Sequence, residues 1–315
     1  MIPKRVSLPF PPLEEDVVLM AGEEIAGPAE LLAALARERR ELARRVELLE
    51  ARAGQIAFES VCGAKDDSQH IEFYDGTLGV TRDFVEHFSP PVGQLQWNAD
   101  LPQRFSGAGQ APGNVNDVRW GTGGLMTTEL FITAGHCFDS EGSGWVLPSR
   151  DGFTIQPAEI ARLMHVNFNF QLNRETQQPR PEDRFPVLEL LEHRVGGLDY
   201  AIVRLGQNAE GALPGQKYGT LSVAGGDLTA VGAMLCVIQH PNGSPKKIEA
   251  GPLLNNNGGR ISYDSIDTLG GSSGSPIISQ TGEVVGVHTN GGCTAFSGAN
   301  FGVAIGAIRR FSSIL

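Results

Sequence analysis

Three side chains in this sequence have the types and settings needed to activate a serine nucleophile. His136 follows an apolar run in the segment TAGHC, Asp199 precedes an apolar run in GLDYAIVRL, and Ser273 lies among small residues in GGSSGSP. A serine hydroxyl is a weak nucleophile until a base accepts its proton and fixed donors stabilise the developing oxyanion. A carboxylate at the start of an apolar strand is costly to bury unless it is hydrogen-bonded, and an imidazole N–H is a suitable donor. The three segments are therefore candidates for one catalytic site.

The chemistry assigns each of these residues a role. Ser273 attacks, His136 takes and then returns the proton, and Asp199 fixes the imidazole tautomer and stabilises its charged form. The backbone N–H groups of Gly271 and Ser273 are expected to hold the oxyanion, and a glycine at position 271 allows the tight turn that this requires. The expected reaction is hydrolysis through an acyl-enzyme.

A competing motif includes the neighbouring serine. The segment GGSSG also satisfies the pattern G-x-S-x-G, with Ser272 at its centre. An α/β-hydrolase would need an acid and then a histidine well after that serine. No aspartate follows Asp267, and Glu283 and His288 lie too close to one another and to the serine. We therefore favour Ser273 as the nucleophile.

The composition indicates many short strands rather than long helices. The chain of 315 residues contains 40 glycines and 19 prolines, which is typical of a turn-rich protein. Short apolar runs bounded by turn residues predict strands over 119–126, 129–134, 198–205, 228–239, 276–279 and 284–289. This spacing predicts an all-β barrel or sandwich.

The N-terminal residues differ from the rest of the chain. Residues 1–57 are expected to form a tail and then an amphipathic helix over 29–53, with apolar residues at helical spacing. The helix is compatible with packing on the barrels, with self-association, with binding to a protein partner, or with a pro-segment that keeps the enzyme latent. Residues 98–116 and 171–185 are expected to be loops, and residues 303–315 a short closing helix.

Charge and cysteine content exclude several classes of function. The net charge of −11 argues against a nucleic-acid or anionic-membrane binder, because both need a concentrated basic face. The four cysteines form no CxxC pair, the other histidines lack metal-ligand spacing, and we expect neither a metal nor a cofactor. With no recognisable signal peptide or membrane span, a cytoplasmic location is expected, with secretion by another route left open. Two disulfides are compatible with the count but not implied by it.

The catalytic segments resemble those of trypsin-like serine peptidases of the chymotrypsin fold. TAGHC, GLDYAIVRL and GGSSGSP match the family's three catalytic motifs, and the resemblance covers about residues 118–310. IQHP, SSGSP and GVHTNGG resemble the bacterial glutamyl endopeptidases most. The resemblance implies a double six-stranded β-barrel. The N-terminal helical extension, which has no counterpart in the family, and the short C-terminal helix are expected from their helical spacing. The resemblance divides residues 58–315 into a lead-in at 58–115, a first barrel at 116–210 and a second barrel with the helix at 211–315.

The same resemblance implies a pocket for an acidic side chain. Thr268 and His288 match the positions that contact a bound carboxylate in glutamyl endopeptidases. Both can donate hydrogen bonds, and the histidine is expected to add charge. Thr289 and Gly291 would pair with the substrate backbone as an added strand. The alternative is that His288 is an ordinary buried histidine and Thr268 an ordinary turn residue. His240, in the segment IQHPNG, is expected to be structural.

Two departures from the family pattern have consequences. Ser272 stands where many relatives have an aspartate, so activation by a buried N-terminal amine is not available. The cysteine expected near Gly121 is missing, so Cys137 is expected to keep its thiol. A second class of function is therefore kept: a catalytically weak, peptidase-like scaffold that binds peptides or a protein partner.

Overall fold

The computed structural model describes residues 60–139, 144–294 and 296–315. These residues all belong to one compact unit. The expected tail and helix within residues 1–57, including the span 29–53, lie outside the described residues. No helix in the described ranges is long and apolar enough to cross a membrane.

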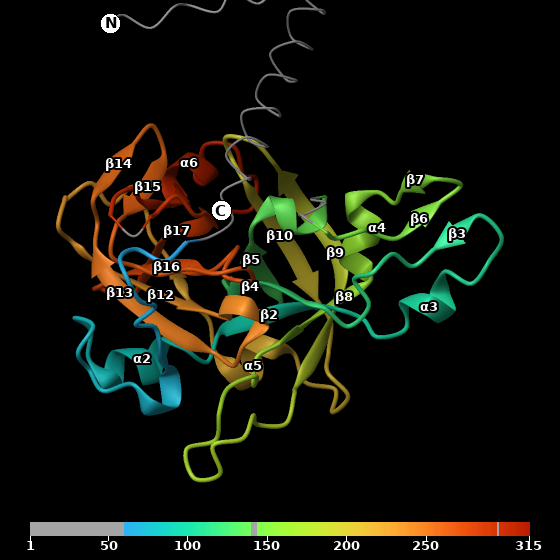
Figure 1. Cartoon of the computed structure of the whole chain (residues 1–315), viewed down its shortest axis with the longest axis horizontal. Helices are drawn as coiled ribbons and strands as arrows, with labels where there is room; N and C mark the ends of the chain where they lie inside the picture. The colour runs from blue at the N-terminus through green and yellow to red at the C-terminus, as the bar shows by residue number, and fades with distance from the viewer. Residues whose placement is uncertain (1–59, 140–143, 295) are drawn as a thin grey trace, which may run out of the picture. The chain divides into compact units, whose positions relative to one another are not determined.

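Six antiparallel strands close into a barrel in the order β10-β5-β4-β2-β8-β9 (Figure 1). They are β2 (Val92–Trp97), β4 (Arg119–Leu125), β5 (Leu130–Thr133), β8 (Met164–Asn167), β9 (Arg184–Arg194) and β10 (Tyr200–Leu205). Large apolar side chains such as Leu95, Phe131 and Val203 fill its core. Closure pairs every strand on both sides and leaves no exposed sheet edge.

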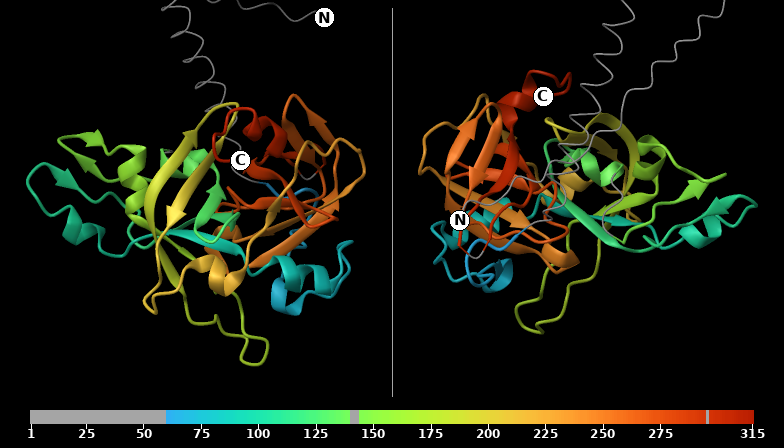
Figure 2. Two further views of the ribbon diagram at one scale, coloured as in Figure 1. Left: turned by 180° about the vertical axis from the view of Figure 1, so that it is seen from behind. Right: turned by 45° about the horizontal axis from the view of Figure 1, so that its top comes forward.

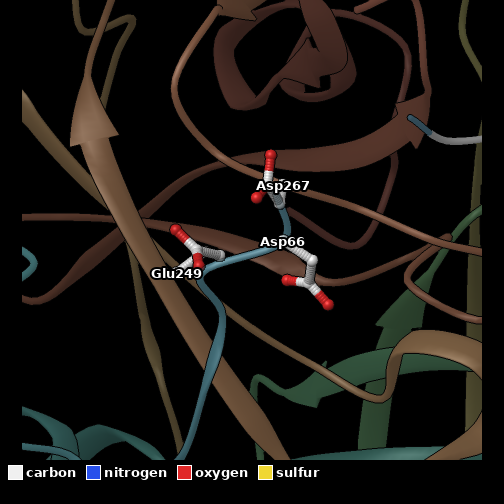
Figure 3. A group of neighbouring side chains, drawn as sticks. All are labelled: Asp66, Glu249 and Asp267. Atoms are coloured by element: carbon white, nitrogen blue, oxygen red, sulfur yellow. The ribbon is translucent and has the colours of Figure 1, made fainter. Parts of the chain in front are cut away.

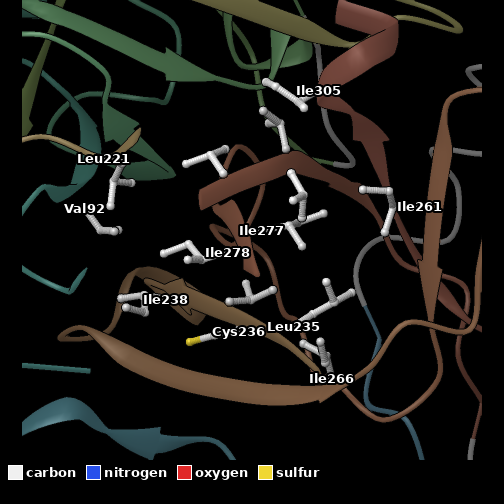
Figure 4. Packing of buried hydrophobic residues seen from close by; sticks show 14 of the residues in the cluster. Val92, Leu221, Leu235, Cys236, Ile238, Ile261, Ile266, Ile277, Ile278 and Ile305 are labelled. Atoms are coloured by element: carbon white, nitrogen blue, oxygen red, sulfur yellow. The ribbon is translucent and has the colours of Figure 1, made fainter. Parts of the chain in front are cut away.

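A nine-stranded sheet forms the second half of the described chain, in the order β1-β13-β12-β16-β17-β18-β15-β14, with β11 paired to β17. Its strands are β1 (Gln69–His70), β11 (Ser222–Val223), β12 (Met234–Gln239), β13 (Lys247–Pro252), β14 (Asn255–Asn257), β15 (Arg260–Tyr263), β16 (Pro276–Ser279), β17 (Glu283–Asn290) and β18 (Asn300–Ala304). Figure 4 shows Ile238, Ile261, Ile277 and Ile278 packed inside this sheet, with Ile305 beside them. β-Branched side chains suit such a strand-built core.

Shorter elements connect and flank these sheets. The α-helices are α2 (Arg82–Phe88), α3 (Leu101–Arg104), α4 (Pro157–Arg162), α5 (Pro214–Tyr218) and α6 (Ile305–Arg309), and the 3₁₀ helices are η1 (Ile71–Phe73), η2 (Gly135–Phe138) and η3 (Pro241–Gly243). A small sheet joins β3 (Gln110–Ala111), β6 (Ser149–Arg150) and β7 (Phe153–Thr154). It stands out from the barrel in all the views of Figures 1 and 2.

The structure confirms the expected all-β, chymotrypsin-like fold, and it corrects several boundaries. The first barrel begins at Val92 rather than at residue 116, because β2 lies between β4 and β8 within it. Residues 98–116 contain α3 and β3 in addition to loops. The strand expected over 228–239 begins only at Met234, and residues 303–304 complete β18 before α6 starts.

One disulfide joins Cys62 to Cys293. Cys137 and Cys236 are buried thiols, which for Cys137 agrees with the expectation from the sequence. Cys62 lies near the start of the described chain and Cys293 follows β17, so the bond ties the lead-in to the second sheet. Disulfides persist mainly in oxidising compartments, which the expected cytoplasmic location is not.

Candidate active site

Strand pairing in the barrel brings His136 and Asp199 together. β10 runs antiparallel to β5 with Ala201 opposite Thr133, so the residues just before β10 lie beside those just after β5. His136 Nδ1 lies 2.5 Å from Asp199 Oδ2, and the backbone N–H of His136 donates to Asp199 Oδ1 at 2.8 Å. Asp199 is buried. These contacts offset the cost of burying its carboxylate.

Gly135 makes the turn into His136 possible. A Cβ atom at this position would lie 1.8 Å from the carbonyl oxygen of Arg194, at the end of β9. Only glycine fits so close an approach of two backbones. The glycine before His136 is therefore required for steric reasons.

The turn that carries Ser273 packs directly on the strands that lead to His136. The carbonyl oxygens of Gly271 and Ser273 accept hydrogen bonds from the hydroxyl and the backbone N–H of Thr122, at 2.7 and 2.9 Å. A Cβ atom on Gly274 would lie 2.0 Å from Thr133 Oγ1 and 2.7 Å from the Ala134 nitrogen. The turn is thus held against the end of β5, and Ser273 itself is largely buried.

The neighbouring serine has a structural task. Ser272 is fully buried, its Oγ accepts the backbone N–H of Leu269 at 3.1 Å, and its carbonyl oxygen accepts the hydroxyl of Ser275 at 2.6 Å. An α/β-hydrolase elbow centred on Ser272 is ruled out by the all-β fold. Ser272 instead stabilises the turn from within.

Gly271 has a backbone conformation that only glycine adopts without strain. Its φ is +98°, and a Cβ atom would lie 2.7 Å from the carbonyl oxygen of His240. The backbone N–H of Asn242 donates to the Gly270 carbonyl at 2.5 Å, so the loop at 240–243 braces this side of the turn. The peptide groups around the nucleophile are therefore fixed in orientation, as an oxyanion site requires.

Thr268 and His288 border the same turn. Thr268 is fully buried, and its hydroxyl has no hydrogen-bond partner among the described residues. His288 lies on β17, where its backbone carbonyl accepts the N–H of Gly274 at 2.8 Å and its own N–H donates to the Ser275 carbonyl at 2.9 Å. A buried hydroxyl that lacks a partner costs stability. A ligand that accepts a hydrogen bond from Thr268 would remove this cost.

His288 is oriented by a residue that the sequence did not point to. The hydroxyl of Tyr263 on β15 lies 2.5 Å from His288 Nδ1. Burial, followed by the proximity of His136, lowers the pKa of His288 to about 3. The imidazole is therefore neutral at physiological pH, which corrects the expectation that it adds charge to the pocket. No local motif marks Tyr263, because its position depends on the pairing of β15 with β18.

Thr289 and Gly291 lie along the end of the strand that carries His288. The β17–β18 pairing shifts register between His288 and Asn290, so Thr289 occupies a bulge, and Gly291 follows the last residue of the strand. Their predicted contact with the substrate backbone stays a prediction. All the candidate residues thus lie on β17, on the turn before β16, or at the ends of β5 and β10.

His240 has the structural role expected from its sequence. It is fully buried, its Nδ1 lies 3.0 Å from the Ser244 carbonyl oxygen, and its ring stacks on Phe170. Burial holds its pKa well below the usual value. A neutral, packed imidazole of this kind supports the loop that braces Gly271.

Comparisons with known proteins bear on the family of the chain. The model of the trypsin-like peptidase domain family matches residues 121–287, more than half of the 315-residue chain. The matched range contains His136, Asp199 and Ser273 and ends one residue before His288. The solved structure of the serine endoprotease from Yersinia pestis covers 72% of this chain and 63% of that chain, at a TM-score of 0.46 and 14% identity.

Several curated proteins are similar over part of their length. An uncharacterized protein of Sinorhizobium fredii, y4fB, is 30% identical over 57% of this chain and 26% of its own length. Glutamyl endopeptidases of Staphylococcus epidermidis and Staphylococcus aureus are 24% and 27% identical, over 45% and 40% of this chain and 54% and 38% of their own lengths. The chain therefore spans between about a quarter and a half of the relatives it matches.

Proposed function

Because the chain belongs to the trypsin-like peptidase family, we propose that it is a serine endopeptidase that cuts protein or peptide substrates. Ser273 Oγ forms a bond to the scissile carbonyl carbon while its proton moves to His136 Nε2. The same proton then passes to the departing amine as the C–N bond breaks. Water repeats the sequence on the acyl-enzyme, which releases the acid product and restores Ser273.

The observation that carries this proposal is the double contact between Asp199 and His136. An aspartate that accepts a hydrogen bond from Nδ1–H keeps the proton on Nδ1 and leaves Nε2 as the proton acceptor, which is the tautomer a general base needs. The separate hydrogen bond from the His136 backbone N–H holds the carboxylate in position to contact the ring. The N–H groups of Gly271 and Ser273 are the proposed donors to the oxyanion.

A preference for cleavage after glutamate, and less after aspartate, is the finer part of the proposal. The unpartnered Thr268 hydroxyl supports it, because a substrate carboxylate would supply the missing acceptor. A neutral His288 can still donate one hydrogen bond, and a bound carboxylate would raise its pKa by favouring the charged form. The two staphylococcal relatives are named glutamyl endopeptidases, which points the same way.

An active-site probe tests the catalytic proposal. A fluorophosphonate should label the full chain and fail to label Ser273→Ala, with hydrolysis of a protein substrate lost in parallel. Absence of labelling in the unsubstituted chain would favour the scaffold alternative or a latent form. A second protein that begins near residue 58 distinguishes these two, because only a latent enzyme gains labelling when the N-terminal residues are removed.

A peptide library tests the specificity. We expect cuts mainly after glutamate, and His288→Ala should lose those cuts more than any others. Cleavage mainly after basic or large apolar residues would contradict the acidic pocket while leaving the peptidase proposal intact.

The roles of residues 1–57 and the location of the protein stay proposals. We propose that the expected helix over 29–53 mediates self-association or contact with a protein partner. Light scattering on the full chain and on the shortened protein tests this, since only the full chain should associate. Mass spectrometry without reductant, on protein taken from its native cells, tests location, because a cytoplasmic protein should carry Cys62 and Cys293 as thiols.

A further inference from the structure

Three carboxylates from distant parts of the chain converge behind the turn that carries Thr268. Asp66 comes from the lead-in, Glu249 from β13, and Asp267 from the position just before Thr268 (Figure 3). One carboxylate oxygen from each lies within 4.8 Å of the others. Asp66 is exposed, whereas Glu249 and Asp267 are buried, so the cluster is reached from solvent on one side only.

Glu249 is the member of the cluster whose carboxylate lacks a hydrogen-bond donor. Its side chain is fully buried, and neither of its oxygens accepts a hydrogen bond from a donor group among the described residues, while the acidic side chain of Asp67 lies beside it. Buried carboxylates are normally paired, hydrogen-bonded or bound to a metal ion. Acidic side chains packed this closely need either a bound cation or a shared proton to offset their charge.

The other two carboxylates have donors, but these do not reach Glu249. Asp267 accepts the backbone N–H groups of Cys62 and Asp67 at 2.6 and 3.2 Å. Asp66 accepts the N–H of Ser68 at 2.9 Å and lies 3.6 Å from the ammonium group of Lys247.

We propose that Asp66, Glu249 and Asp267 bind a calcium ion. The set contains only carboxylate oxygens, which are the ligands of hard cations, and it lacks the histidine and cysteine ligands typical of zinc. Calcium takes six to eight oxygen ligands in flexible geometry, so water fills the remaining positions on the exposed side near Asp66. No local motif marks this site, because Asp66 lies far in sequence from Glu249 and Asp267.

A calcium ion bound here would link the lead-in, through Asp66, to the residue just before Thr268 in the proposed specificity pocket, through Asp267. Ser60, six residues before Asp66, accepts the N–H of Thr268 with its carbonyl oxygen at 3.4 Å. Its hydroxyl accepts the N–H groups of Gly292 and Cys293 at 2.9 and 2.6 Å. The ion would stabilise this arrangement whether or not the chain is an active peptidase, so binding and stability are its readouts.

Calorimetry and thermal unfolding of the full chain test the proposal after removal of metal with a chelator. Calcium chloride should give saturable heat and, at about 100 times Kd, raise Tm by about 5 °C or more. Glu249→Gln keeps the shape of the side chain but removes its charge, and it should lose both signals. Glu175→Gln, which changes an exposed glutamate in the loop at 171–185, is the matched control and should keep both.

Asp66→Asn, at the exposed ligand, provides a second test if Glu249→Gln fails to fold, and it should weaken binding at least 10-fold. The proposal is overturned if calcium produces neither heat nor a Tm shift, because protons rather than a metal ion then neutralise Glu249. It is also overturned if magnesium or zinc gives the larger shift, or if Glu175→Gln loses the response as completely as Glu249→Gln.

Discussion

Asp199 holds His136 at two points, one on the ring and one on the backbone, through its two separate oxygens. The pairing of β5 with β10 places both residues, but the two contacts decide how the ring is turned. The backbone contact fixes the position of His136, whereas the ring contact fixes the tautomer of its imidazole.

Asp199→Asn should therefore lower kcat by about 10⁴-fold while leaving the fold intact. The amide oxygen can still accept the His136 N–H, but the amide NH₂ then faces Nδ1 and forces the proton onto Nε2, where it blocks general-base catalysis. Steady-state kinetics and the Tm of the same preparation provide the measurement. A kcat within 10-fold of the unsubstituted enzyme would show that the contact does not set the tautomer.

Ser272 and Ser273 should respond in opposite ways to loss of their hydroxyls. Ser272→Ala leaves the N–H of Leu269 without its acceptor and should destabilise the protein by about 1 kcal/mol, with fluorophosphonate labelling retained. Ser273→Ala should abolish labelling with little change in denaturant midpoint. If Ser272→Ala loses labelling and Ser273→Ala keeps it, the nucleophile is Ser272 and not Ser273.

Thr268→Val should stabilise the protein and weaken catalysis on acidic substrates. The substitution removes a buried hydroxyl that has no partner, so the free energy of unfolding should rise by about 1 kcal/mol. A lost hydrogen bond to a charged group costs about 1.5–3 kcal/mol, so kcat/KM for a glutamate peptide should fall about 10- to 100-fold. Equal losses on glutamate and glutamine peptides would show that Thr268 does not recognise the charge.

Lys246 gives the fold a pH dependence with a definite sign. It is fully buried, its ammonium nitrogen donates to the carbonyl oxygens of Ser89 and Phe168 at 2.8 and 3.0 Å, and burial lowers its pKa from 10.5 to about 7. Between about pH 7 and pH 10 the unfolded chain therefore binds one more proton than the folded one. Stability from this residue rises with pH across that window and is lost as pH falls toward 7.

Lys246→Met should remove that rise. Denaturant unfolding at several pH values should give the unsubstituted protein the steeper slope, by up to about 1.4 kcal/mol per pH unit. Above about pH 10, where Lys246 is neutral in both the folded and the unfolded chain, the variant should be the less stable protein, because two carbonyl groups lose their donor. Parallel curves for the two proteins would mean that Lys246 has an ordinary pKa in the fold.

The strands and catalytic segments could be predicted because their signals are local. Apolar runs between turn residues located β4, β5, β10, β16 and β17, and each catalytic segment carries its own small-residue turn. β12 was predicted too long because residues 228–233 have some apolar side chains but form a turn. β2 was assigned to a lead-in because sequence spacing does not reveal that it closes the barrel.

The supporting contacts could not be predicted, because they join residues that lie far apart in sequence. The Tyr263 contact with His288 requires β15, β18 and β17 in adjacent positions. The contacts of Ser60 with Gly292 and Cys293 span most of the chain. Neither residue type carries a distinguishing motif, and the neutral state of His288 follows only from its burial.

The Cys62–Cys293 bond, with a sequence separation of 231, closes a covalent ring that contains the strands from β1 to β17. A single cut in any loop between these cysteines opens the polypeptide but leaves one molecule, whose two pieces stay at high effective concentration. Such a nicked chain should migrate as one species without reductant and as two fragments with it. For a protein proposed to cut polypeptides, the ring protects against the first act of self-cleavage.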